Sequence, residues 1–469
     1  MNKAHLLTAF VSVSLLIVIT FTVAHAQSLP TKPFTSTDSS VAEIQLALSV
    51  RSSVVESTVV DIAVDPDFDA SDPAVALCAG DQYLVVFEYG SEIYAQYLDS
   101  AGKRLGIPFV VSTDVYTESN PAVACDWNRN LFVVVWQHDD VNSGDMDIQA
   151  QVILGTRPAS RETNVAAILT VADSLIDETN PAIACNSDAS SCLVVFERAE
   201  NSGDVYGQRV VFSGSTFLRQ GDWFAIGSFT AAERNPVVAW ATFDDDYLVS
   251  WEYQNASVWR IVTAYVWDTW QGGSQIQTGT TFLTGPELPY DQLNPAAAYN
   301  GRSHRFLLVF QHAFFGQATD YDIYGLRLLP GGGSQGDLIA IDFSQDLNEQ
   351  PAVAYGSGPY YLPGGRGADQ FLVTYVTETL SGRWIQAHPV YGTHQVGSQL
   401  LSSTPMTLYQ TTAGPNFDLL NPDVVGSLNN GRYFAVWESM TGGFAGTDYD
   451  VRGRLIAPYG VFLPSIIRQ

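Results

Sequence analysis

The sequence predicts an all-β fold, a seven-bladed β-propeller of four-stranded antiparallel blades. One unit recurs seven times, and successive copies begin 48 to 71 residues apart. Each unit holds four short stretches rich in Val, Ile, Phe and Tyr, separated by Gly, Asn, Asp or Ser. No long stretch shows the three- and four-residue apolar spacing of a helix. Repeats of this length with four strands each are typical of propeller blades.

The first element of each unit begins at a proline that follows Asp, Asn or Gln. These anchor prolines are Pro73, Pro121, Pro181, Pro236, Pro295, Pro351 and Pro422. Small and branched residues follow, as in "PAVA", and they suit an innermost strand because blades converge on a narrow axis. Since a following proline restricts the residue before it, we expect the preceding Asp, Asn or Gln to be extended.

The second element ends at an aromatic residue and is apolar at consecutive positions, as in "LFVVVW". Such a run predicts a middle strand that neighbouring blades cover on both faces. Glu or Gln follows the aromatic residue in six units, and Val376 is the exception. A catalytic residue is normally unique, so this recurring Glu or Gln predicts an internal hydrogen-bonding role.

The third element has a β-branched residue followed two positions later by Ala or Gly, which permits close approach of the next sheet. A fourth apolar stretch, such as "IPFVVS", leads to the next anchor. Seven anchors are accompanied by eight such stretches, and the surplus lies at the chain ends. We expect residues 57–64 to complete the last blade beside residues 449–467, because an unclosed ring exposes strand edges.

Three motifs of the fifth unit, "NPAAAY", "FLLVFQ" and "DIYGLR", resemble those of secreted bacterial β-propeller repeat proteins, whose units read roughly N-P-A-V-A, L-V-V-W-E and D-I-Y-G-x-R. The resemblance covers residues 51–469, although the fourth and sixth units depart from the third motif. It implies the architecture and no particular activity, because propellers host lyases, glycosidases, oxidoreductases and binding scaffolds alike.

The N-terminus predicts export. An apolar run from Leu6 to Val23 precedes Ala24-His25-Ala26, so residues 1–26 are expected to be a signal peptide cleaved after Ala26. An uncleaved anchor is the alternative, and it would be the chain's only contact with a membrane. Residues 27–50 are expected to be a flexible leader and residues 51–469 the propeller. The protein is therefore predicted to be secreted or on the cell surface.

Four cysteines fit an oxidising compartment. Cys185 and Cys192 flank the short turn "NSDASS", so a disulfide across this hairpin is predicted. Cys78 and Cys125 occupy nearly equivalent places in neighbouring units and could pair between them. The alternative is four buried free thiols.

The net charge of -27 excludes nucleic acid as an expected partner. Several acidic residues lie between the second and third elements of a unit, where oxygen ligands could hold Ca²⁺. The candidate ligands are Asp139, Asp145, Asp147, Asp320, Asp322, Asp448 and Asp450. The alternative is that these are solvated turn residues. His138 and His312, which follow aromatic-Gln pairs, are interpreted as exposed loop histidines.

The sixth unit carries a Gly/Pro-rich insertion with Tyr360, Tyr361 and Arg366, which we take as candidate ligand-binding residues because tyrosines make good sugar platforms. The alternative is that the insertion covers a sheet edge. No nucleophile elbow or phosphate loop is found, so no catalytic residue is assigned. The sequence favours a non-catalytic propeller that binds a glycan or an extracellular protein. The alternative is a secreted carbohydrate-active hydrolase or lyase with its site at the axis.

Overall fold

The structure is a computed structural model that describes residues 58–64, 69–112, 116–140, 144–159, 166–213, 216–244, 246–282, 290–313, 320–332, 338–357, 369–393, 399–411, 418–440 and 449–456. The chain divides into two units, Met1–Ser49 and Val50–Gln469, and every described residue belongs to the second. The expected signal peptide and leader therefore lie outside the described residues.

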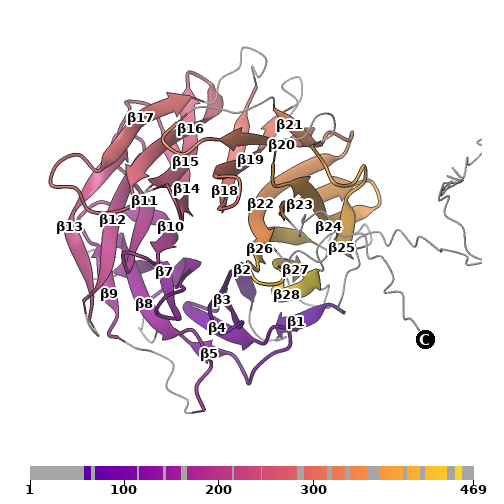
Figure 1. Cartoon of the computed structure of the whole chain (residues 1–469), viewed down its shortest axis with the longest axis horizontal. Helices are drawn as coiled ribbons and strands as arrows, with labels where there is room; N and C mark the ends of the chain where they lie inside the picture. The colour runs from indigo at the N-terminus through magenta and orange to yellow at the C-terminus, as the bar shows by residue number, and fades with distance from the viewer. Residues whose placement is uncertain are drawn as a thin grey trace, which may run out of the picture. The chain divides into compact units, whose positions relative to one another are not determined.

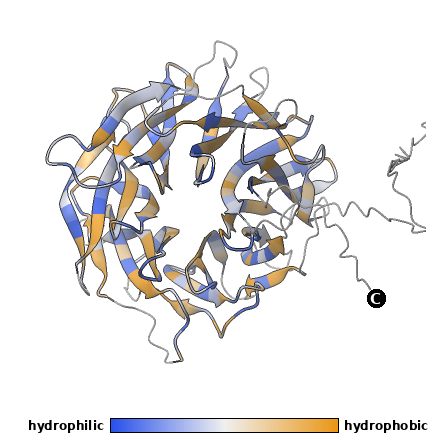
Figure 2. Ribbon diagram, viewed as in Figure 1, coloured by the Kyte–Doolittle hydropathy of each residue, from blue (hydrophilic) through white to orange (hydrophobic). Residues whose placement is uncertain are grey.

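The described residues form seven four-stranded antiparallel sheets. Figure 1 shows these sheets as blades around a central opening, which confirms the predicted fold. Hydrophobic residues run along the strands of every blade (Figure 2). Within the described ranges, no helix has the length and apolarity needed to cross a membrane.

Six blades each use four consecutive strands. The first three are β2 (Ala70–Leu77), β3 (Tyr83–Tyr89), β4 (Glu92–Leu98) and β5 (Phe109–Val110); β6 (Glu118–Asp126), β7 (Leu131–Asp140), β8 (Asp145–Leu154) and β9 (Leu169–Ala172); and β10 (Glu178–Asn186), β11 (Ser191–Arg198), β12 (Asp204–Ser213) and β13 (Thr216–Gly227). The next three are β14 (Glu233–Ala241), β15 (Asp246–Asn255), β16 (Val258–Trp267) and β17 (Ile276–Phe282); β18 (Gln292–Asn300), β19 (Arg305–Ala313), β20 (Tyr321–Leu328) and β21 (Ile339–Asp342); and β22 (Leu347–Ser357), β23 (Asp369–Thr379), β24 (Gly382–Tyr391) and β25 (Met406–Gln410).

The seventh blade joins the two ends of the propeller. Its order is β26 (Leu419–Gly426), β27 (Tyr433–Met440), β28 (Tyr449–Ile456) and then β1 (Val60–Ala63) as the outermost strand. Val60 pairs with Gly453 in antiparallel register. The expectation that the N-terminal stretch closes the ring is confirmed, whereas residues 457–467 lie outside the described part.

A strand bulge marks the anchor proline of every blade. In the first blade Ser71 pairs with Glu88 and Ala74 with Val86, so Asp72 and Pro73 together face one residue. The residue before each anchor proline has a φ between 45° and 52°. The expectation of an extended conformation there is wrong, because the bulge requires a left-handed residue. Asn and Asp tolerate this region better than most residues do.

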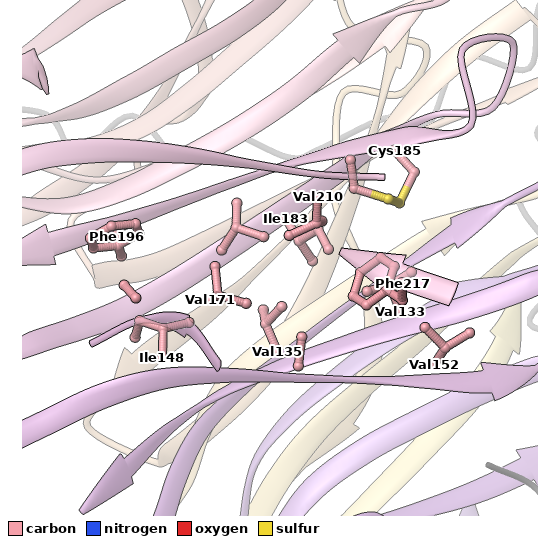
Figure 3. Close-up of a cluster of buried hydrophobic side chains, with 14 residues drawn as sticks. Val133, Val135, Ile148, Val152, Val171, Ile183, Cys185, Phe196, Val210 and Phe217 are labelled. Carbon is pink, nitrogen blue, oxygen red and sulfur yellow. A yellow bond between two sulfur atoms is a disulfide. The ribbon is translucent and has the colours of Figure 1, made fainter. Parts of the chain in front are cut away.

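The core lies between the blades. Figure 3 shows Val133 and Val135 of β7 packed among Ile183, Val210 and Phe217 of the next blade. The middle strands are covered on both faces, as predicted, because consecutive residues Val133 to Val135 are all fully buried. The glycines of the third strands make room for side chains of their own blade: a side chain at Gly453 would collide with Phe434 of the adjacent strand β27.

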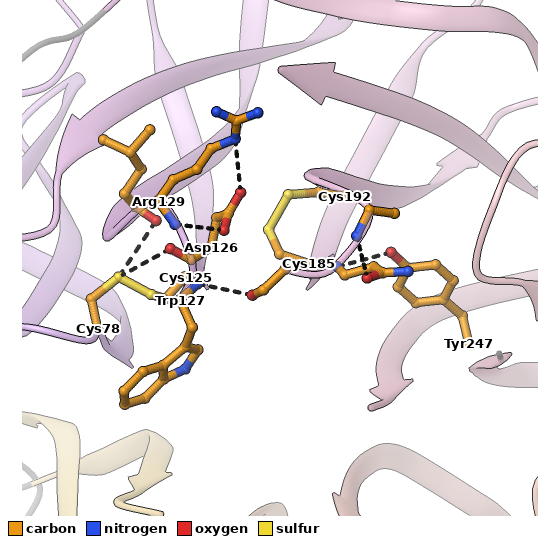
Figure 4. The surroundings of a disulfide bond; sticks show 12 residues. Cys78, Cys125, Asp126, Trp127, Arg129, Cys185, Cys192 and Tyr247 are labelled. Atoms are coloured by element: carbon orange, nitrogen blue, oxygen red, sulfur yellow. Dashed lines mark hydrogen bonds and ion pairs between the residues drawn. A yellow bond between two sulfur atoms is a disulfide. The ribbon is translucent and has the colours of Figure 1, made fainter. Parts of the chain in front are cut away.

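Two disulfides are present among the described residues (Figure 4). Cys185 and Cys192 face each other across the first hairpin of the third blade, with their Cα atoms 3.9 Å apart. Cys78 bonds to Cys125 in the second blade, with a Cα separation of 5.5 Å. Both predicted pairings are confirmed. The disulfide between Cys78 and Cys125 covalently links the first and second blades.

Candidate active site

A hollow of about 380 Å³ lies at the propeller axis. It is lined by the anchor prolines and the residues that precede them, which are Asp72, Asn120, Asn180, Asn235, Asn294, Gln350 and Asn421. In an antiparallel blade the first strand begins at the end where the second strand stops and the third begins. We call this end of the propeller, with the residues before the anchor prolines and the hairpins between second and third strands, the anchor face.

Hydrogen bonds between blades form a closed circuit around this hollow. In each bond, the backbone N–H of the residue before an anchor proline donates to a side-chain oxygen of the preceding blade. The bonds are Asn120 to Glu88 (2.6 Å), Asn180 to Gln137 (2.8 Å), Asn235 to Glu197 (2.5 Å), Asn294 to Glu252 (2.7 Å), Gln350 to Gln311 (3.0 Å), Asn421 to Gln350 (3.0 Å) and Asp72 to Glu438 (2.6 Å). The recurring Glu or Gln thus has the hydrogen-bonding role that the sequence predicts.

The sixth blade completes the circuit in a different way. Val376 stands where the other blades have Glu or Gln, so this blade lacks the usual acceptor. Gln350, whose side chain is longer than that of Asn, supplies the missing oxygen to the Asn421 N–H at 3.0 Å. Its amide also donates to Asn421 Oδ1 at 2.9 Å. The two departures from the repeat therefore compensate for each other.

Carboxyl groups gather where the first and seventh blades meet. Asp72 replaces the Asn of other blades and lies between Glu88 and Glu438, and burial together with the Asp72 charge raises the pKa of both glutamates. Asp423, at a position where other units have Ala or Val, accepts the Val75 N–H at 2.8 Å, and burial raises its pKa to about 6. Asp72 and Asp423 are the acidic residues in the lining of the axial hollow, and both lie where the first and seventh blades meet.

Two histidines occupy the same position in the second and fifth blades. His138 is on β7 and His312 is on β19, and only 5% and 4% of their surfaces are exposed. The interpretation of both as exposed loop residues is wrong, because each second strand continues past its aromatic residue and includes the histidine as a buried strand residue.

His138 is held by a carboxylate. Its Nδ1 lies 2.9 Å from Glu118 Oε1, and the two residues are register partners on neighbouring strands. The ring of Tyr116 meets the imidazole edge-on, with 5.4 Å between ring centroids. The carboxylate of Glu118 therefore fixes the orientation of the imidazole ring.

His312 has no such partner. Gln292 replaces the glutamate, and neither ring nitrogen of His312 has a hydrogen-bond partner among the described residues. Tyr290 and Tyr324 contact the imidazole edge-on, at centroid distances of 6.4 Å and 5.6 Å. Burial, reinforced by the nearby Arg260 charge, lowers the pKa of His312 to about 4. At neutral pH its imidazole is therefore a neutral base.

An acid lies on the next strand, facing the same side of the sheet. Asp322 is the register partner of His312, and side chains of such partners have Cβ atoms about 5 Å apart. Burial, together with the charges of Asp320 and Asp342, raises the pKa of Asp322 to about 7. The fifth blade thus places a base that is neutral beside a carboxyl group that keeps its proton up to neutral pH.

The residues around His312 and Asp322 are partly exposed to solvent, and one of them is positively charged. Tyr290, Tyr324 and Arg260 are half-buried, and the Arg260 guanidinium donates to the Tyr290 carbonyl at 3.2 Å. The fifth-blade cluster, by which we mean His312, Asp322, Tyr290, Tyr324 and Arg260, therefore combines a base, an acid, two phenols and a positive charge.

The predicted calcium ligands do not converge among the described residues. They lie in the second, fifth and seventh blades, and no group of three or more His, Cys, Asp or Glu suited to a metal is found in the described ranges. Asp145, Asp147, Asp322 and Asp450 are buried rather than solvated, Asp139 and Asp320 are half-buried, and Asp448 lies outside the described residues. Calcium binding stays a prediction.

Tyr360, Tyr361 and Arg366 of the sixth-unit insertion also lie outside the described residues, so their role in ligand binding stays a prediction. The fifth-blade cluster, in contrast, was not expected from the sequence. A signal for it exists: "YTESNP" and "YDQLNP" place a tyrosine four residues before the Asn of two anchors, in the two units that also carry the histidine.

Fold and site define a seven-bladed propeller with an acid–base cluster on its anchor face. No protein-family model and no curated protein matches the chain. Among solved structures, the chain is similar to an ulvan lyase, a polysaccharide lyase, with a TM-score of 0.54 and 8% identity over 85% of this chain and 96% of that one.

Two further solved structures have lower TM-scores. The propeller domain of the trilobed protease from Pyrococcus furiosus has a TM-score of 0.44 and 10% identity, over 86% of this chain and 98% of that one. An α-L-arabinofuranosidase of Fusarium graminearum has a TM-score of 0.45 and 10% identity, over 68% of this chain and 92% of that one.

The comparison corrects the functional expectation. The leading hypothesis from the sequence, a non-catalytic scaffold that binds a glycan or protein, is wrong: the solved structure whose fold is similar over 85% of this chain is a polysaccharide lyase. Motifs that are contiguous in the chain do not indicate this site. The fifth-blade cluster is instead assembled from β19 and β20, from Tyr290 before β18, and from Arg260 on β16 of the fourth blade.

Proposed function

We propose that the protein is a secreted carbohydrate-active enzyme that cleaves glycosidic bonds of a polysaccharide on the anchor face. The observation that carries this proposal is the pairing of His312, whose ring nitrogens have no partner among the described residues, with Asp322 on the adjacent strand. Cleavage of a glycosidic bond needs one group that accepts a proton and another that donates one to the leaving oxygen.

The environments of the two residues suit these roles. Burial lowers the pKa of His312 to about 4, so it is ready to accept a proton over most of the pH range. Burial raises the pKa of Asp322 to about 7, so it holds a proton to donate. Pairs of groups whose pKa values are pushed apart by their surroundings are typical of acid–base catalysis.

Elimination is the reaction that this cluster fits best. His312 would take the proton from the carbon next to a uronic acid carboxylate, and the electron pair left behind would form a carbon–carbon double bond. The bond to the glycosidic oxygen then breaks, and Asp322 donates its proton to that oxygen. Arg260 supports this reaction because its positive charge would neutralise the carboxylate of the sugar.

Hydrolysis is the second candidate, and the axial acids favour it. Glu88 and Glu438 both have raised pKa values and flank Asp72 at the hollow. A protonated and an ionised carboxyl group on either side of a sugar are the usual groups for hydrolysis. Their hydrogen bonds to the blade circuit argue against this role, because both already accept backbone N–H groups of the next blade.

Secretion is supported by the two disulfides, since such bonds persist in oxidising compartments. The mature chain should then begin at Gln27. Intact-mass analysis of protein recovered from the medium tests this; a chain that retains residues 1–26 would instead support the anchor.

The function itself is tested by incubating the purified protein with a panel of polyuronates and neutral polysaccharides. Elimination produces an unsaturated sugar that absorbs in the ultraviolet, whereas hydrolysis produces only new reducing ends. We expect His312→Gln and Asp322→Asn each to lower kcat at least about 100-fold, with an unchanged melting temperature.

His138→Gln is the matched control, because His138 has the same position in another blade but is already held by Glu118. It should keep activity close to that of the parent. Full activity in His312→Gln, or no cleavage of any polysaccharide by the parent, would contradict the proposal.

A further inference from the structure

A groove of about 370 Å³ lies at the outer edge of the propeller, away from the anchor prolines, between the third and fourth blades. One wall is part of β13, with Asp222, Trp223 and Phe224. The other wall is the segment between β16 and β17, with Trp270 and Gln275. We call it the outer groove. None of its lining residues belongs to the fifth-blade cluster or to the axial hollow.

The wall on β13 is a local departure from the repeat. Gly207 pairs with Phe224 and Arg209 with Gln220, so residues 221–223 bulge out opposite a single residue of β12. β13 is 12 residues long, whereas the outermost strands of the other blades have between two and seven. Additions to one blade of a constant scaffold are where recognition usually lies.

The bulge seats an exposed indole. Trp270 is 40% exposed, and its ring lies over Gly221, whose φ is 70°. A side chain added at Gly221 would collide with this ring. The glycine is therefore needed for two reasons, the left-handed backbone of the bulge and the space that the indole occupies.

A buried arginine fixes the opposite wall. Arg209 is fully buried; its Nη1 donates to the Asp268 carbonyl at 2.8 Å and its Nη2 to the Trp267 carbonyl. Gln275, itself buried, donates to the carbonyls of Gln271 at 2.6 Å and Gly273 at 3.0 Å. The wall between β16 and β17 is thus held in place without a ligand, which lowers the entropy cost of binding one.

We propose that the outer groove is a second carbohydrate-binding site that takes an uncharged stretch of a polysaccharide. Exposed aromatic rings beside amide and hydroxyl groups are the surfaces that sugar rings pack on and hydrogen-bond with. Asp222 is the one ionisable residue in the lining and is acidic. An anionic segment would therefore be repelled. This site goes beyond the proposed enzymatic function and does not depend on it.

The test is affinity electrophoresis of the folded protein through native gels that contain arabinan, a neutral β-glucan or a polyuronate. At least one neutral polymer should retard the parent. Trp270→Ala should weaken that retardation about tenfold in apparent Kd, and Trp270→Tyr should restore most of it. Retardation by the polyuronate should be equal in the parent and in Trp270→Ala.

Phe243→Ala is the matched control, because Phe243 is an aromatic residue 65% exposed outside the groove. His312→Gln separates this site from the enzymatic one, since it should bind the neutral polymer as the parent does even if no polymer is cleaved. Equal retardation of the parent and Trp270→Ala, or no retardation by any neutral polymer, would overturn the proposal. Binding of peptides but not of polysaccharides at Trp270 would overturn it too.

Discussion

Substitutions at single positions give equivalent residues of the seven similar units different hydrogen-bond partners. His138 and His312 occupy equivalent positions in two blades. Glu118 lies within hydrogen-bond distance of His138, whereas Gln292 stands at the corresponding place beside His312, whose ring nitrogens have no partner among the described residues. The sequence shows both substitutions, but not that these side chains meet. That information comes from the register between strands, which aligns residues about 20 positions apart in the chain.

Gln350 and Val376 provide a test at this scale. Gln350→Asn should remove the acceptor for the Asn421 N–H and cost about 1 kcal/mol of unfolding free energy, because a half-buried donor loses its partner. Adding Val376→Gln should restore the arrangement of the other blades and recover most of that loss. Urea denaturation of both single variants and the double variant measures the coupling. Strictly additive effects would refute the compensation.

At the scale of strands, repeat spacing was enough to predict all seven blades, because each element has its own side-chain pattern. The bulge at the anchor prolines was not predictable from single positions, since proline alone favours an extended neighbour and only the pairing of two strands shows the extra residue. The outer groove was missed for a similar reason: the bulge in β13 has no sequence pattern that distinguishes it from a longer strand.

The two disulfides should differ in their effect. Cys78 and Cys125 are 47 residues apart, whereas Cys185 and Cys192 are 7 apart. Because a longer closed loop restricts the unfolded chain more, paired Cys→Ala variants should lose about 4 kcal/mol for the inter-blade bond and about 2 kcal/mol for the hairpin bond. Equilibrium unfolding in denaturant compares them. Equal losses would show that loop closure does not determine their contributions.

Calcium binding can be tested at the hairpin between the second and third strands of the second blade. If Asp139, Asp145 and Asp147 hold Ca²⁺ with ligands outside the described residues, a chelator should lower the melting temperature and added Ca²⁺ should restore it. Asp145→Asn should abolish the response. An unchanged melting temperature in chelator would leave these residues without a role in metal binding.

At the scale of the whole molecule, closure of the ring depends on four residues. β1 provides the outermost strand of the seventh blade and buries Ile62 and Ala63. Deleting residues 51–64 should expose the edge of β28 and cost at least about 3 kcal/mol of unfolding free energy. Deleting residues 27–50 is the control and should leave the melting temperature unchanged. A deletion of residues 51–64 that melts like the parent would contradict the closure.

The proposed function of the whole molecule is tested most directly by the pH profile of kcat/KM, measured with a polysaccharide that the protein cleaves. The rate should rise as pH passes about 4, where His312 loses its proton, and fall above about 7, where Asp322 loses the proton it must donate. Asp322→Asn should remove the upper limb together with most of the activity. A profile with no limb near either value, or one left unchanged by Asp322→Asn, would contradict the assignment of this pair as the acid and base.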